Sequence, residues 1–270
     1  MPAALSADRV IQWYPGHMAR AMRRIGEYLS LIDIVVEVVD ARVPHSGRNP
    51  SLDKLAARRA RLLVLNREDL ADPHVTKAWI AEFARDGVHA IAVDGRRQSS
   101  VKRVATAMLA LAKARSGNSR AIVVGVPNSG KSSIINGLLR RSAAKTEDRA
   151  GVTRQLQWFR LSPNVELMDT PGILVPKIAG KEAQWKLAVC SAVPRERYDP
   201  EAVARAFHDW VVAHRPRARV PDLDEFAAQR GFVRRGGEID YHNAAQSYLR
   251  VLNEGTFGRF SFETPKGHDA

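Results

Sequence analysis

The residues best suited to chemistry form a glycine-rich run near the middle of the chain. Residues 125–132 read Gly-Val-Pro-Asn-Ser-Gly-Lys-Ser, a complete G-x-x-x-x-G-K-S motif. In this motif main-chain N–H groups cradle phosphates at a helix N-terminus, so a nucleoside triphosphate is the expected ligand. Lys131 would reach the β and γ phosphates, and the Ser132 hydroxyl would ligate Mg²⁺. The nucleotide-binding residues predicted here are Asn128, Ser129, Gly130, Lys131, Ser132 and Ser133.

A second phosphate-side motif follows downstream. Asp169-Thr170-Pro171-Gly172 matches D-x-x-G at the end of an apolar run. Asp169 would hold Mg²⁺, usually through water, and the N–H of Gly172 would meet the γ phosphate. Thr153 lies in a polar loop between the two motifs. It would complete the Mg²⁺ shell only while a γ phosphate is present.

A base-selecting box lies upstream, at Asn66-Arg67-Glu68-Asp69. An aspartate carboxylate can accept from the guanine N1–H and exocyclic amine, a pair that adenine does not offer. This box therefore predicts GTP and argues against an ATPase or a kinase. Arg67 replaces the usual lysine, and its stem and plane can still stack on the base. Main-chain groups of Ala92 and Val93 are the expected second base contact.

The order of these motifs is inverted relative to an ordinary GTPase. There the phosphate loop opens the domain and the guanine box comes near its end, whereas here residues 66–69 precede residues 125–132. The inversion predicts a circularly permuted GTPase domain.

The attacking water needs an orienting group, and the usual glutamine after D-x-x-G is absent. Ile173 stands at that position and cannot polarise water. His17, in Trp13-Tyr14-Pro15-Gly16-His17-Met18, is the catalytic candidate within the chain. A structural histidine there, with the water oriented by a partner, is the alternative.

The motifs sit at the ends of predicted strands. Strand patterns are expected at residues 33–39, 61–65, 88–93, 121–124, 155–161 and 165–168. Helical patterns between the strands predict a doubly wound, mostly parallel α/β sheet, which binds ligands at the carboxyl ends of its strands. Beyond this part, helices are expected at 182–192, 201–213, 223–230 and 241–252. The predicted domains are 1–178, which opens with a basic amphipathic helix at 18–31, and an all-helical domain at 179–270.

Composition bears on partners and compartment. Lys plus Arg number 42 and Asp plus Glu 29, which gives a net charge of +13 and a pI of about 10.3. Such an excess favours a polyanionic partner, nucleic acid first. The single Cys190 excludes an intramolecular disulfide or a multi-cysteine zinc site. Without a long apolar stretch or a signal-peptide pattern, we expect a cytoplasmic protein with no membrane span.

The chain resembles the circularly permuted GTPases of the ribosome biogenesis GTPase A type. The likeness runs along nearly the whole sequence. It includes Gln12 to Met18, Asp40-Ala41-Arg42-Val43-Pro44, the phosphate loop, residues 169–174 and the tail segments 236–240 and 257–263. Departures from the family pattern are Arg67 for lysine, Ala92 for the usual serine and Ala150 where proline is common.

This resemblance implies a hydrolase that assists late maturation of the large ribosomal subunit, with rRNA as partner and mitochondrial relatives. It implies that His17 takes part in activity and that Asn128 is a ligand of K⁺. It implies hydrolysis stimulated by potassium and by the ribosome, and we expect a monomer.

Of two alternative functions, the residues argue against one and leave the other open. A permuted GTPase of the small-subunit type would need an N-terminal barrel and a zinc cluster; too little chain precedes Asp33, and one cysteine cannot build the cluster. A GTP-dependent rRNA-binding scaffold with little hydrolysis stays open, because Ile173 leaves turnover dependent on His17 or a partner.

Overall fold

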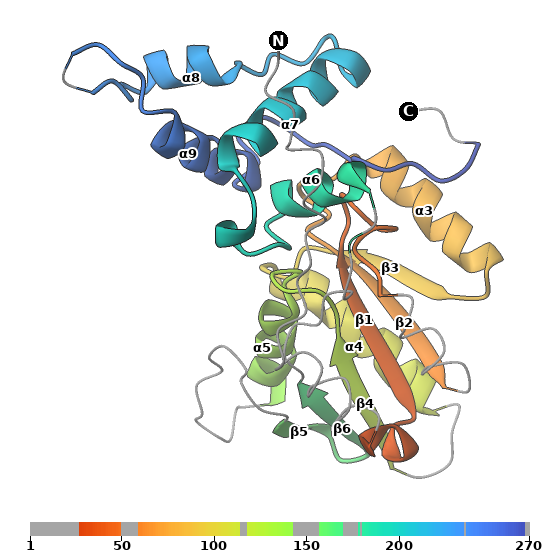
Figure 1. Ribbon diagram of the computed structural model, residues 1–270. Coiled ribbons are helices and arrows are strands. Elements are labelled where there is room, and N and C mark those ends of the chain that lie inside the picture. Colours follow the sequence, from red (N-terminus) through yellow and green to blue (C-terminus); the bar gives the residue numbers. More distant parts are fainter. Residues whose placement is uncertain are drawn as a thin grey trace.

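Six strands form one sheet in the computed structural model, which describes residues 27–49, 59–113, 118–142, 157–169, 178, 180–234 and 236–267. The strand order across the sheet is β3-β2-β1-β4-β6-β5 (Figure 1). The strands are β1 (Ile34–Asp40), β2 (Ala60–Asn66), β3 (His89–Val93), β4 (Ser119–Val124), β5 (Gln157–Ser162) and β6 (Val165–Asp169).

Strand direction confirms the mostly parallel sheet. β3, β2, β1, β4 and β6 run parallel, and only β5 pairs antiparallel, in a hairpin with β6. In the register, Asp40 pairs with Asn66, and Asn66 pairs with Val93. Because parallel strands end at the same edge, the residues that follow β2, β3 and β4 meet there.

Both faces of the sheet are covered, which explains why the central strands read as nearly continuous apolar runs. Ile34, Val36 and Val38 of β1 pack in one core cluster with α4 (Gln98–Lys113) and α5 (Lys131–Ser142). Val39 belongs to the cluster on the other face, which α3 (Pro73–Arg85) covers. The alternation follows from the two-residue period of a strand.

Local capping sets where α3 begins. The Asp72 side chain accepts hydrogen bonds from the N–H groups of His74 and Val75, and Pro73 occupies the first helical position. A capping aspartate followed by proline satisfies free N–H groups and pre-sets the backbone angle, so the helix starts sharply after β2.

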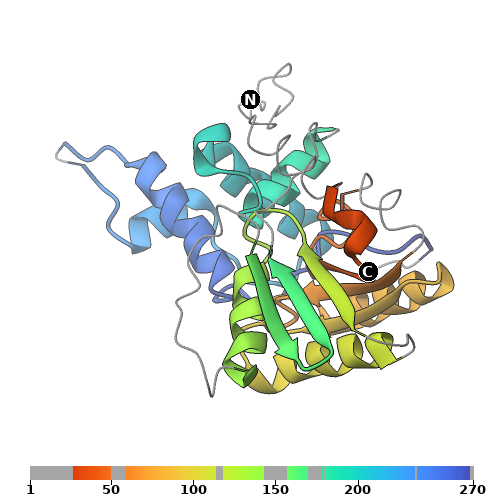
Figure 2. The ribbon, with the colours of Figure 1, turned by 90° about the horizontal axis from the view of Figure 1, so that it is seen from below.

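Four further helices gather beyond one end of the sheet rather than on its faces (Figures 1 and 2). They are α6 (Lys181–Val189), α7 (Pro200–His214), α8 (Leu223–Gln229) and α9 (Tyr241–Asn253). Their core is rich in edge-to-face aromatic pairs, among them Phe207 with Tyr248 and Phe226 with Tyr248. This confirms the predicted helical region.

The chain after α9 returns to the sheet. The N–H of Phe260 donates to the Leu70 carbonyl and that of Phe262 to the Arg42 carbonyl, each at 2.9 Å. The Glu263 carboxylate accepts from the N–H groups of His45 and Ser46. The segment after α9 is therefore hydrogen-bonded to the loops that follow β1 and β2.

Two expectations concern parts that the structure leaves open. The basic helix at 18–31 lies almost wholly outside the described residues, and its described end includes a 3-10 turn, η1, at Leu29–Leu31. The helical core also takes in Val43 and Val126 from the sheet side, so the division at residue 178 stays a proposal. No helix in the described ranges is long and apolar enough to cross a membrane.

Candidate nucleotide site

The phosphate loop connects β4 to the first turn of α5 and curls through several left-handed positions. Asn128 has φ of 56° and Gly130 has φ of 89°. A Cβ at Gly130 would lie 2.0 Å from the Asn66 amide nitrogen, so both the angle and the space require glycine. The phosphate loop therefore packs directly on Asn66 of the guanine box.

Lys131 is buried and held over the loop that it follows. Its Nζ donates to the main-chain carbonyls of Gly125, at 3.1 Å, and Val126, at 2.9 Å. The buried Ser129 Oγ has no hydrogen-bond partner in the described part of the chain. A positive charge and an unsatisfied hydroxyl inside a glycine-rich loop suit a phosphate ligand.

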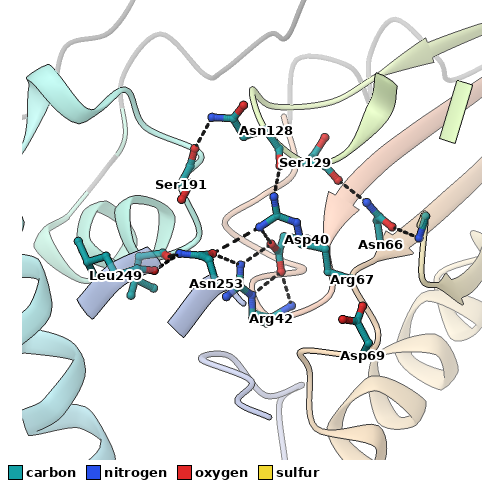
Figure 3. Close-up of polar contacts among 12 residues, drawn as sticks. Asp40, Arg42, Asn66, Arg67, Asp69, Asn128, Ser129, Ser191, Leu249 and Asn253 are labelled. Carbon is teal, nitrogen blue, oxygen red and sulfur yellow. Dashed lines mark hydrogen bonds and ion pairs between the residues drawn. The ribbon is translucent and has the colours of Figure 1, made fainter. Parts of the chain in front are cut away.

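Asn66, at the end of β2, joins the two loops beside it (Figure 3). Its Nδ2 donates to the Ser129 carbonyl at 2.8 Å, and its Oδ1 accepts from the Gly95 N–H at 2.8 Å. We infer that Asn66 positions the phosphate loop and the loop after β3, and that base selection falls to Asp69.

The Asp69 carboxylate has one engaged and one open oxygen. Oδ2 pairs with the Arg96 guanidinium, which also approaches Asp94 at 3.5 Å. Oδ1 is buried and finds no donor within the described ranges. A buried acceptor without a donor is costly, and the N1–H and amine of guanine would satisfy it.

A cavity of about 150 Å³ lies between these loops. It is lined by Asn66, Arg67, Leu70, Asp94, Gly95, Arg96, Gly130, Ser133 and Asn253. Guanine-box residues and phosphate-loop residues share its wall. We propose that the base occupies one side of this cavity and the phosphates the other; Asp69 does not itself line it but pairs with the lining residue Arg96.

Arg67 reaches across the site from a left-handed position, with φ of 61°. Its Nη2 donates to the Asn128 carbonyl at 3.0 Å, and its Nη1 lies 3.5 Å from Asp40. Asp40 is buried against Arg42, with 2.8 Å between Oδ2 and Nη2. Burial alone would raise the Asp40 pKa, but the ion pair with Arg42 holds that pKa below its ordinary value.

The other predicted residues are placed as follows. Glu68 faces away from the cavity, toward Ser100 and Arg103. Ala92 and Val93 lie within β3, and the Val93 carbonyl accepts from the Glu68 N–H. Ser132 and Ser133 are exposed on the first turn of α5, where Ser132 is available to Mg²⁺.

Four predicted residues are described only in part or not at all. His17, Thr153 and Gly172 lie outside the described residues, and for Asp169 only the backbone is described. The backbone of Asp169 ends β6 opposite Val123, next to the phosphate-loop strand, which is where an Mg²⁺ residue is expected. Their predicted parts stay proposals.

Sequence reasoning missed three residues of this region. Arg96 pairs with Asp69, Asn253 lines the cavity, and the Ser191 carbonyl accepts from the Asn128 side chain at 2.8 Å. Arg96 lies three residues after Val93, a predicted base contact, so proximity in the sequence could have indicated it. Ser191 and Asn253 carry no local signal, because they come from a different part of the chain.

Phosphate loop, guanine box and strand order together define a P-loop GTPase whose elements are circularly permuted. Comparisons with known proteins agree. A model of the 50S ribosome-binding GTPase family matches residues 120–203. The chain is 38% identical to ribosome biogenesis GTPase A of Bacillus cereus, over 95% of each chain. It is 36% identical to ribosome biogenesis GTPase A of Priestia megaterium, over 94% of this chain and 97% of that protein.

Among solved structures, GNP-bound YlqF from Thermotoga maritima superimposes with a TM-score of 0.72 at 31% identity, covering 92% of this chain and 99% of that one. The chain belongs to the ribosome biogenesis GTPase A family, as its sequence motifs predicted. It is a GTP-binding enzyme that hydrolyses GTP, with Mg²⁺ as the usual companion ion of the nucleotide.

Proposed function

We propose that this GTPase acts in late assembly of the large ribosomal subunit by binding rRNA, and that the particle stimulates its hydrolysis. The observation that carries the proposal is identity of 36–38% along almost the whole chain to proteins named for ribosome biogenesis. A cytoplasmic, monomeric protein fits this role, and a mitochondrial location is the less favoured alternative.

The charge of the helical region supports an RNA partner. Arg217 and Arg219 are exposed in the loop after α7 and have no carboxylate partner among the described residues. Arg215, in the same loop, is held by Asp72 of the α3 cap at 3.0 Å. An anchored loop that carries exposed arginines is suited to phosphate contacts.

GTP turnover should be measured with and without purified large subunits. We expect the subunits to raise turnover at least about tenfold, the scale of a group that orients water or stabilises charge. Particle binding with unchanged turnover would favour the scaffold alternative, and the absence of both would overturn the ribosomal role.

For potassium, the proposed ligand is Asn128. Its Nδ2 is engaged by the Ser191 carbonyl, while its Oδ1 has no partner within the described residues. A bound K⁺ would place a fixed positive charge near the phosphates. We expect hydrolysis to be slower in Na⁺ than in K⁺, and Asn128→Ala to remove that difference. Equal wild-type rates in the two salts would refute the site.

For water activation, the proposed residue is His17. Support comes from Ile173, which replaces the usual glutamine, and from the family resemblance of the segment around His17. His17→Ala should keep GTP affinity while subunit-stimulated turnover falls at least about tenfold. Normal stimulated turnover in the folded variant would shift the search to groups of the ribosome.

A further inference from the structure

The guanine box and the last turn of α9 meet in a polar contact that we call the α9 junction. On the sheet side stand Arg42, Arg67 and Asn128, and on the helical side Ser191 and Asn253 (Figure 3). Arg67 and Asn253 are 186 positions apart in the chain. Only the folded arrangement brings them together.

Asn253 faces both ways within this junction. Its Nδ2 donates to the carbonyls of Val189, at 2.9 Å, and Leu249, at 2.7 Å, which fixes the carboxamide to the helical core. Its Oδ1 is thereby turned toward the sheet, where it accepts from Arg42 Nη2 at 2.9 Å and Arg67 Nη1 at 3.4 Å. The side chain therefore acts as an oriented acceptor.

The position at the end of α9 adds to this orientation. Asn253 is the last residue of the helix, where the carbonyl end of the helix dipole favours positive charge. Arg42 and Arg67 supply that charge. Asn253 also lines both the cavity of about 150 Å³ beside the guanine box and a larger one of about 380 Å³ on the helical side.

Arg67 can make use of this acceptor because its donors form a rigid fork. One nitrogen holds the Asn128 carbonyl of the phosphate loop while the other lies between Asp40 and Asn253. A lysine carries one nitrogen and cannot bridge these atoms at once. Arg67, which replaces the usual lysine, thus has Asn253 as a hydrogen-bond partner.

We propose that Asn253 is a positioning residue for nucleotide binding: it holds the Arg67 fork so that the stem of Arg67 forms the wall of the base cavity. By linkage, an occupied base cavity stabilises the end of α9. The inference rests on the nucleotide site described above and not on the ribosomal role.

A double-mutant cycle on fluorescent GDP affinity tests the proposal in the full-length protein. Asn253→Ala should weaken binding about fivefold in the wild-type background, in the range of couplings between contacting residues. In an Arg67→Lys background, where the fork is gone, the same change should alter affinity less than about twofold. Gln246→Ala, another amide on α9 that contacts His242, is the matched control and should leave both affinities unchanged.

Equal losses of affinity in both backgrounds would show that Asn253 only stabilises the fold, and would overturn the proposal.

A second experiment does not need the Asn253→Ala protein and therefore still tests the proposal if that variant does not fold. GDP should slow amide hydrogen exchange at Leu249–Asn253 in the wild type, and not in Arg67→Lys. Unchanged exchange in the wild type upon saturation with GDP would also overturn it, whereas failure to bind GDP at all would refute the nucleotide site itself.

Discussion

At the residue scale, the four residues of the guanine box make different contacts. Asn66 joins two loops, Arg67 bridges to the phosphate loop and α9, and Asp69 keeps one buried oxygen that accepts from no donor in the described part of the chain. Glu68 carries the same charge as Asp69 but turns toward Ser100. We therefore propose that base recognition depends on the Asp69 carboxylate alone.

Asp69→Asn should move nucleotide preference from GTP toward xanthosine triphosphate, because the amide can pair with the oxo group that replaces the exocyclic amine. We expect GTP affinity to fall at least about tenfold, since a buried polar pair becomes mismatched. Glu68→Gln is the matched control and should retain GTP affinity. Competition binding with the two nucleotides measures both variants, and full GTP affinity in Asp69→Asn would show the box to be misassigned.

At the scale of elements, the carboxyl end of β1 carries a buried ion pair next to the site. Asp40 and Arg42 are almost fully buried, so each requires the other. The pKa of Asp40 lies below its ordinary 3.8, which means that folding favours the carboxylate. The stabilising contribution is complete above that ordinary value and is lost as pH falls through the lower pKa of the folded state.

Asp40→Asn should lower the free energy of unfolding by about 3 to 5 kcal/mol near neutral pH, because it leaves the Arg42 charge buried and unpaired. The difference from wild type should shrink as pH falls below 3.8, because the unfolded wild-type chain then binds a proton at Asp40 while the folded carboxylate stays ionised down to its lower pKa. Denaturant unfolding at a series of pH values gives the comparison. A difference that does not change with pH would contradict the ionised pair.

Strands, helix starts and loop motifs could be predicted because their signals are local. The strand that ends at Asn66 shows its apolar pattern directly, and the G-x-x-x-x-G-K-S run at 125–132 marks the passage from β4 into α5. The contacts of Asn253 and Ser191 could not be predicted, because an asparagine at a helix end and a main-chain carbonyl have no type-specific pattern. Their function depends on where the helical region packs.

At the scale of the whole molecule, the helical region borders the nucleotide site directly. Asn128 of the phosphate loop bonds to the Ser191 carbonyl, and the tail after α9 bonds to loops following β1 and β2. A hinge-type response of residues 180–270 to the γ phosphate, through the D-x-x-G segment that shortly precedes them in the sequence, is our proposal for how nucleotide state reaches the partner surface.

Replacement of both Arg217 and Arg219 by alanine should weaken binding to large subunits and reduce the slope of log affinity against log salt by about 2, roughly one for each phosphate contact. Arg205→Ala is the control, because Arg205, on α7 of the same helical region, is already paired with Asp224 of α8. Affinity measured across a salt series checks the slope. An unchanged slope would place the RNA contact elsewhere on the molecule.

The most direct test of the account is sedimentation of the wild-type protein with purified large ribosomal subunits, in a non-hydrolysable GTP analogue and in GDP. The site and the helices that border it predict tighter binding with the analogue, at least about fivefold, the lower end of usual coupling between two sites. Equal binding in the two nucleotides would contradict the account, because the helical region would then be an anchor that does not respond to the γ phosphate.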